Sequence, residues 1–235
     1  MDSAGYTALT RQSGLMREMQ VIANNISNIS TNGFRREGLF YSEYVEDVGD
    51  GPSLSMANGN TRLVDLSQAG LNQTGGVFDF AIQGEGFFMI NTPDGERLTR
   101  SGSFTPSAEG TLVNNDGYPL LDQGRAPISV PPDAKIIALA QDGTLSADGQ
   151  PIAKIGTWNP VHRESLRHDA GTSFSAGEVD AAENFSLFQG QLEESNVNAV
   201  TEIARMIEVQ RAYELGQGFM DREDQRMRSV IQTLG

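Results

Sequence analysis

Two helix-type repeats, one at each end of the chain, constrain this sequence more than any other feature. Residues 1–31 predict an N-terminal helix, and residues from Val197 to the end predict a second one. Both are long compared with the globular average of about 11 to 12 residues. The first carries an apolar stripe with alternating steps of four and three residues, which is heptad spacing: Leu15, Met19, Ile22, Ile26 and Ile29.

The C-terminal repeat has one apolar row and one mostly polar row. The companion row is apolar at Ile203 and Ile231, but Gln210, Gln217 and Asp224 lie between them. A two-helix seam that buries both rows would be poor, so we expect one row on a partner helix and polar residues on further neighbours. The apolar row recurs every seven residues: Met206, Tyr213, Met220, Met227 and Leu234.

The middle of the chain has the pattern of short antiparallel strands. From Val64 to about Phe188, short apolar or alternating runs are separated by turn-forming pairs such as Asp94-Gly95. Before them, "GLFYSEYVEDV" could be a strand or a short helix, and "GDGPSLSMANGN" is loop by composition. The predicted class is therefore α+β, with long N- and C-terminal helices forming a coiled-coil-like domain and an inserted all-β domain. We place the segments at 1–34 for the first helix, 35–64 for a linker, 65–190 for the β domain and 191–235 for the second helix.

Composition excludes several classes of protein. The 235 residues carry a formal net charge of -14, so a general positive field for nucleic acid is absent. No cysteine is present, which excludes disulfides and thiolate metal sites. We also expect no cleavable signal peptide and no membrane insertion, because no basic-then-apolar leader and no apolar run of about 18 residues is found.

No constellation of residues points to catalysis. His162 and His168 lack a shared metal-binding spacing, and we interpret them as loop histidines. The run "QGEGFF" at 83–88 lacks the third glycine and the following helix of a phosphate loop, so its glycines predict a bulge or tight turn between strands. Arg35 and Arg36 fit a solvated turn better than a basic patch. We therefore predict no enzyme, no cofactor and no metal.

Four asparagines lie within nine residues at the end of the first predicted helix. Asn24, Asn28 and Asn32 follow the spacing that puts residues on one helix face. They could form a solvated face leading into an Asn32-Gly33 cap that ends the helix. Alternatively, a row of amides could pair with another helix and fix its register. Physical reasoning alone does not separate these two interpretations.

Three long stretches resemble the bacterial flagellar rod and hook axial proteins. They are "VIANNISNISTNGFRRE", "FDFAIQGEGFFMINTPDGERLTRSGSFTPSAEGTLVNNDGYPLL" and "ESNVNAVTEIARMIEVQRAYE", in the order of that family. The opening segment and the short connection at about 46–62 are most similar to the proximal-rod branch. Gly216-Gln217-Gly218 departs from the family pattern and predicts a weak point or bend in the second helix.

The resemblance implies a structural subunit of the proximal rod, the drive shaft across the periplasm. Its implied partners are copies of itself, other proximal and distal rod subunits, and the flagellar type III export apparatus. A distal-rod or hook-type subunit is the alternative within the family, and a β-domain adhesin or a carboxylate hydrolase is the alternative outside it. The expected assembly interface is Leu15, Met19, Ile22, Asn24, Asn25, Ile26, Asn28, Ile29, Asn32, Gly33, Phe34, Ile203, Met206, Tyr213, Met220, Met227, Ile231 and Leu234.

Overall fold

The computed structural model describes residues 3–46, 54–169 and 171–234, which form two compact units. Unit 1 contains Met1–Ser27, Glu37–Leu63 and Asn198–Gly235. Unit 2 contains Asn28–Arg36 and Val64–Val197. Helices lie at the two ends of the chain and short antiparallel strands fill its middle, so the α+β class is confirmed.

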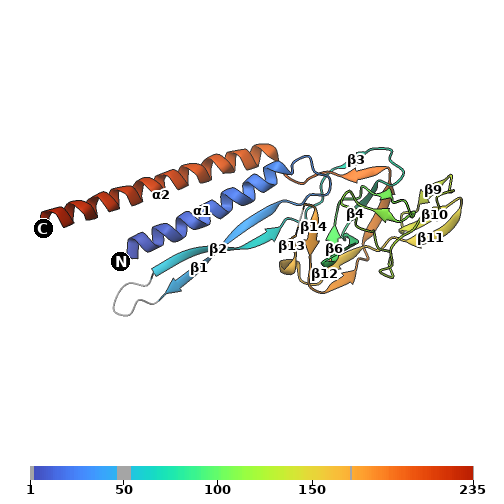
Figure 1. The fold of residues 1–235 in the computed structure, drawn as a ribbon, viewed down its shortest axis with the longest axis horizontal. Coiled ribbons are helices and arrows are strands. Elements are labelled where there is room, and N and C mark those ends of the chain that lie inside the picture. The colour runs from blue at the N-terminus through green and yellow to red at the C-terminus, as the bar shows by residue number, and fades with distance from the viewer. Residues whose placement is uncertain (1–2, 47–53, 170, 235) are drawn as a thin grey trace. The chain divides into compact units, whose positions relative to one another are not determined.

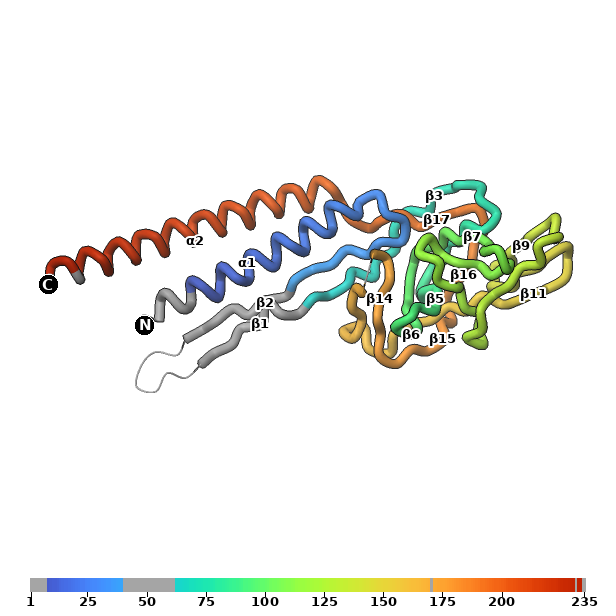
Figure 2. The backbone as a smooth tube through the Cα atoms, viewed as in Figure 1, coloured from blue at the N-terminus to red at the C-terminus, as the bar shows by residue number. Residues whose placement is uncertain are grey.

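Unit 1 is built from two helices and a strand pair. Helices α1 (Ser3–Ser27) and α2 (Ala199–Leu234) lie side by side and run in opposite directions (Figure 1). Figure 2 shows the same two helices side by side. Strands β1 (Glu37–Glu46) and β2 (Leu54–Val64) form a two-stranded sheet. Strand β2 replaces much of the loop predicted from composition, because pairing with β1 satisfies its backbone hydrogen bonds.

Helix α1 ends at Ser27, earlier than the predicted cap at Asn32-Gly33. A turn follows, in which the Thr31 N–H donates to the Asn28 carbonyl at 3.2 Å and the Thr31 hydroxyl to the Asn28 side chain, also at 3.2 Å. Such side-chain hydrogen bonds compete with helix continuation. Gly33 has a φ of +73°, and a Cβ there would lie 2.2 Å from the Ser101 nitrogen, so only glycine fits this close approach.

Helix α2 begins with a side-chain cap and continues without interruption. The Asn198 side-chain oxygen accepts from the Thr201 N–H at 3.1 Å, as an N-cap asparagine does. The helix runs through Gly216 and Gly218, so the predicted weak point does not interrupt it. At Gly216 an added Cβ would lie 2.6 Å from the Gln12 Nε2, which shows that the missing side chain lets α1 come close.

Unit 2 is made of short strands in several small sheets. Strand β4 pairs antiparallel with β16 and β3 with β17, so strands far apart in sequence are joined. The strands are β3 Leu71–Gln73, β4 Phe80–Gly84, β5 Phe88–Thr92, β6 Gly95–Thr99, β7 Thr105–Pro106, β8 Leu112–Val113, β9 Ile137–Leu139, β10 Thr144–Ala147, β11 Gln150–Lys154, β12 Trp158–Pro160, β13 Arg167–His168, β14 Ser173–Ser175, β15 Val179–Ala181, β16 Phe185–Gln189 and β17 Gln191–Glu193, with a 3-10 turn at Arg163–Ser165.

Two apolar clusters form the core of unit 2. The larger contains Phe80, Phe88 and Leu120, and Phe88 packs edge-on against Phe104 with ring centroids 5.7 Å apart. The smaller contains Phe87 and Phe174 together with Trp158, the chain's one tryptophan. In the described part of the chain, neither helix is long and apolar enough to cross a membrane.

Candidate assembly interface

A buried asparagine joins three elements of unit 1. Asn25 on α1 is fully buried, and its Nδ2 donates to the Glu202 carboxylate of α2 at 3.0 Å. The same amide nitrogen donates to the Glu37 carbonyl at 2.9 Å, and its oxygen accepts from the Glu37 N–H at 3.0 Å. Asn25 thus ties β1 and α2 to one point on α1.

Two further polar contacts join α1 to α2 nearer the N-terminus of α1. The Glu18 carboxylate accepts from Arg205 Nε at 2.9 Å and from its Nη2 at 2.8 Å. The Gln12 amide donates to the Tyr213 carbonyl at 2.9 Å. Together with Asn25, these residues make a polar seam along the helix pair, because each of them bonds to a residue of α2.

The N-terminal part of the predicted interface divides into buried and accessible residues. Ile22 is buried, whereas Leu15, Met19, Ile26 and Ile29 are partly buried. In the predicted amide row, Asn24 and Asn32 are exposed and Asn28 is partly buried. The asparagine enclosed within the chain is instead Asn25, three residues after Ile22 on the same helix face. Asn25 belongs to the expected interface, and its side chain bonds within unit 1.

The C-terminal part of the predicted interface is mostly accessible. Ile203 is 51% exposed and Met227 is 52% exposed, while Met206, Tyr213 and Met220 are partly buried. The side chains of Ile231 and Leu234 lie outside the described residues. Along the part of α2 whose side chains are described, the apolar row is therefore not fully buried against α1.

Among the side chains of unit 1 that the structure describes, two apolar surfaces are uncovered. Val200, Ile203 and Ile207 lie on one face of α2 and are 78%, 51% and 43% exposed. A groove of about 650 Å³ lies between α1 and α2, and it includes Leu215, which is 74% exposed. It is lined by Ala8, Arg11, Gln12, Leu15, Ala212, Leu215, Gly216 and Phe219.

Gly33 and Phe34, two residues of the expected interface, are buried inside unit 2. Phe34 is fully buried and stacks on the His168 ring with centroids 5.0 Å apart. The His168 Nε2 lies 2.9 Å from the Arg35 carbonyl oxygen. The segment after α1 is therefore part of the packed interior of unit 2.

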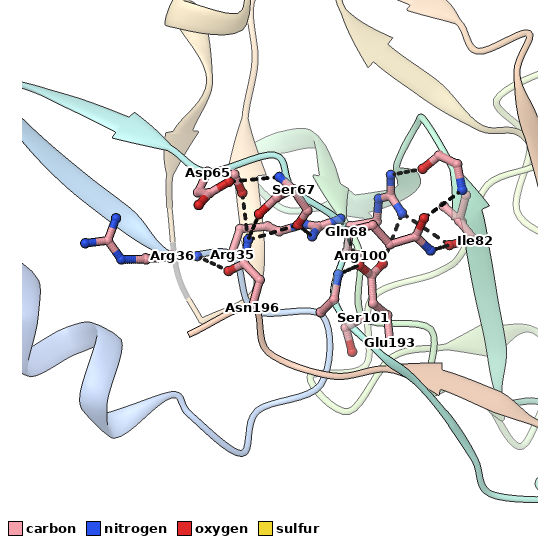
Figure 3. A network of polar contacts seen from close by, with 12 residues as sticks. Arg35, Arg36, Asp65, Ser67, Gln68, Ile82, Arg100, Ser101, Glu193 and Asn196 are labelled. Carbon is pink, nitrogen blue, oxygen red and sulfur yellow. Dashed lines mark hydrogen bonds and ion pairs between the residues drawn. The ribbon is translucent and has the colours of Figure 1, made fainter. Parts of the chain in front are cut away.

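The sequence suggested that Arg35 lies in a solvated turn, but the structure shows its side chain buried. It is 1% exposed and pairs with Glu193 at 2.9 Å, and Glu193 also pairs with Arg100 at 3.0 Å (Figure 3). Burial lowers the pKa of Arg35, and it lowers the pKa of Arg100 to about 10, with Glu193 opposing the shift. Because Glu193 is 158 residues away from Arg35, no pattern in the sequence around Arg35 indicates this pairing.

The prediction of turn glycines in the run at 83–88 is confirmed. Gly84 and Gly86 join β4 to β5 with φ values of +101° and +107°, as a tight turn between strands requires. Among the described residues, no group of three or more histidines and carboxylates is placed to hold a metal ion.

Comparison with known families assigns the three resembling stretches. Residues 6–35 match the family described as flagella basal body rod protein. Residues 81–147 match the D1 domain of the flagellar hook protein FlgE/F/G. Residues 189–233 match the C-terminal region of the flagellar basal body rod FlgEFG proteins.

Individual relatives align along the whole chain. The flagellar basal-body rod protein FlgF of Caulobacter vibrioides is 36% identical over 244 residues, covering 100% of this chain and 99% of the relative. FlgF of Mesorhizobium japonicum is 35% identical with the same coverage. The rod protein FlgG of Bacillus subtilis is 27% identical over 96% of this chain. The resemblance inferred from the sequence motifs is confirmed, and the chain belongs to the flagellar basal-body rod protein family, on the FlgF side of it.

Proposed function

We propose that this protein is a structural, non-enzymatic subunit of the proximal part of the flagellar basal-body rod. The observation that carries the proposal is the full-length similarity to relatives named as rod protein FlgF. The uncovered apolar surfaces of unit 1 support it, because exposed patches of this kind mark contact sites in proteins that assemble. The partners are copies of this chain and other rod subunits.

The helix pair is the assembling part of the subunit in this proposal. The seam between α1 and α2 is largely polar, whereas Val200, Ile203 and Ile207 face away from it. In the rod, helices of neighbouring subunits cover these faces and the groove at Leu215, giving a coiled-coil-like tube. The exposed Asn24 and Asn32 then sit where they can pair with a neighbour and fix its register.

The proposal also states what the subunit does in the rod and how it is exported. A rod subunit works in the basal body, where the rod crosses the periplasm, and it transmits torque through its contacts with neighbours. We propose export through the flagellar type III apparatus. A distal-rod identity is the second candidate, favoured by alignment with FlgG over 96% of this chain.

The test is assembly in cells that lack this gene. Ile203→Glu with Ile207→Glu places two charges on the uncovered face of α2, and we expect no complete rod and no swimming. Thr201→Glu is the matched control, because it adds a charge at an exposed α2 position that is one residue from Val200 and two from Ile203 and therefore lies off that face. Normal swimming of the double variant would contradict assembly through this face. A density map of the basal body would then place the chain at the proximal or the distal level.

A further inference from the structure

The segments by which the chain enters and leaves unit 2 lie against each other. Residues 28–36 follow α1, and residues 193–197 precede α2. The Gly33 N–H donates to the Glu193 carbonyl at 2.7 Å, and the Asn196 N–H donates to the Phe34 carbonyl at 3.4 Å. The two segments are thus hydrogen-bonded to each other within unit 2, although about 160 residues separate them.

The carboxylate of Glu193 joins these segments to others. It is 1% exposed and receives three donors, two from arginines and one from the backbone. Arg35 Nη2 lies 2.9 Å from one oxygen, which also accepts from the Ala69 N–H at 3.0 Å. Arg100 Nη1 donates to the other oxygen at 3.0 Å (Figure 3). One anion therefore holds donors from three separate parts of the chain.

The two arginines make further hydrogen bonds to backbone carbonyls, and their two positive charges share the single carboxylate of Glu193. Arg100 donates to the Gly84 carbonyl at 2.7 Å and the Ile82 carbonyl at 3.3 Å. Arg35 donates to the Ser67 carbonyl. Both guanidinium groups are at least 96% buried, and Glu193 is the carboxylate they share. Removing that carboxylate would leave two buried cations together, an arrangement that is strongly unfavourable.

Asn196 makes a second connection among the same segments. Its Nδ2 donates to the Asp65 and Ser67 carbonyls, each at 3.0 Å. Its side-chain oxygen accepts from the Arg36 N–H at 2.6 Å, and the Arg36 carbonyl accepts from the Asp65 N–H at 2.8 Å. Three of the four places where the chain passes between the units, near 36, 64 and 197, are therefore anchored on the unit 2 side, and the fourth follows α1 at residue 28.

We propose that Arg35, Arg100, Glu193 and Asn196 form a junction clamp that makes these three passages one cooperative element. When the clamp is broken, the segments 33–36, 65–69 and 193–196 lose their order together, ahead of the core strands of unit 2. The clamp fixes the points at which β1, β2 and α2 join unit 2. The inference goes beyond the proposed function, because it rests on contacts within unit 2 and holds whether or not the chain assembles.

Amide hydrogen exchange on the purified full-length chain tests the clamp. In Glu193→Gln, we expect protection in all three segments to fall together by about 100-fold or more. Strands β4 and β5 should keep their protection within about threefold. Glu96→Gln is the matched control, because Glu96 is 39% exposed and pairs with the exposed Arg125 at 3.0 Å. The control should leave all three segments unchanged.

A milder variant keeps the test decisive if Glu193→Gln does not fold. Arg35→Lys retains the charge but loses the planar donor group that reaches Ser67 and Glu193 together. It should lower protection at 65–69 and 193–196 as well as at its own segment. Loss confined to 33–36 would overturn the proposal, since the passages would then be independent. Equal loss in β4 and β5 would also overturn it, since the clamp would not be a separate element.

Discussion

Unit 2 buries aromatic and aliphatic side chains at its centre, whereas many of the buried positions of unit 1 are polar. The larger core cluster of unit 2 includes Phe80, Phe88 and Leu145, all fully buried. Among the described residues of unit 1, the buried hydrophobic side chains are Val21, Ile22, Leu39 and Val209. Its buried polar side chains are Gln12, Glu18, Asn25, Glu37 and Glu202.

The apolar core of unit 2 and the buried polar groups of unit 1 do different things: the first stabilises, and the second specifies how elements pair. Apolar burial stabilises by roughly 1.5–3 kcal/mol for each large side chain, so unit 2 has the means to be stable without partners. A buried hydrogen bond contributes only about 1 kcal/mol net, but it penalises every wrong pairing. The polar seam of unit 1 therefore specifies how α1 and α2 pair more than it stabilises the pair. Stability of unit 1 then depends on what covers its outer faces.

Truncation before Met220 should have the largest effect on assembly and little effect on unit 2. It removes Met220, Met227 and Leu234 from the apolar row of α2. We expect complete loss of rod incorporation and swimming, because long helices gain most of their stability from packing. Fluorescence of Trp158, which lies in unit 2, should be unchanged. A truncated chain that supports normal swimming would show that this row does not carry assembly.

Phe88→Ala should produce the largest loss of folding stability. The side chain is fully buried in the larger core cluster, so we expect unit 2 to lose about 3–5 kcal/mol. Urea unfolding followed by Trp158 fluorescence measures unit 2 directly. Phe219→Ala is the matched control, because Phe219 is 40% exposed on α2 and should change this transition by less than about 0.5 kcal/mol. Similar losses for the two variants would remove the contrast between the units.

Hydrogen exchange on the dilute monomer should show the contrast without any substitution. We expect α1 and α2 to be protected at least about 100-fold less than β4 and β5, because their outer faces lack partners. The segment 31–36 should follow unit 2, since Gly33 and Phe34 are buried there. Strong protection along both helices in a verified monomer would mean that they fold without partners. The stability of unit 1 would then not depend on what covers its outer faces.

Asn25→Ala should weaken unit 1 by on the order of 2 kcal/mol. The substitution removes the amide that bonds to Glu202 and to the Glu37 backbone within a buried site. Thermal unfolding followed by helical circular dichroism reports on unit 1, where both helices lie. Asn24→Ala is the matched control at the preceding, exposed position. Equal behaviour of the two variants would show that the buried amide specifies nothing.

Local patterns predicted the elements, and they did not predict the contacts between distant segments. Heptad spacing found both helices, and turn pairs such as Asp94-Gly95 found the strand region. The end of α1 was misplaced because Thr31 bonds to Asn28 in a turn that competes with the helix. The pairing of Arg35 with Glu193 joins residues 158 positions apart, and no periodicity in either neighbourhood encodes it.

The smallest expected effect on folding, and the sharpest test of the amide row, is Asn24→Ala with Asn28→Ala. Alanine is the better helix former, so Asn24→Ala should gain a few tenths of a kcal/mol in α1. Asn28→Ala should offset this gain, because it removes the side-chain bond to Thr31 in the turn after the helix. We nonetheless expect fewer or misregistered rods, because Asn24 is exposed on α1 and is proposed to pair with a neighbouring subunit. Rod yield and swimming speed measure the loss, with circular dichroism of the monomer as the control for folding. If the double variant assembles as well as the parent, this face of α1 is merely solvated, and Asn25 is the asparagine that matters.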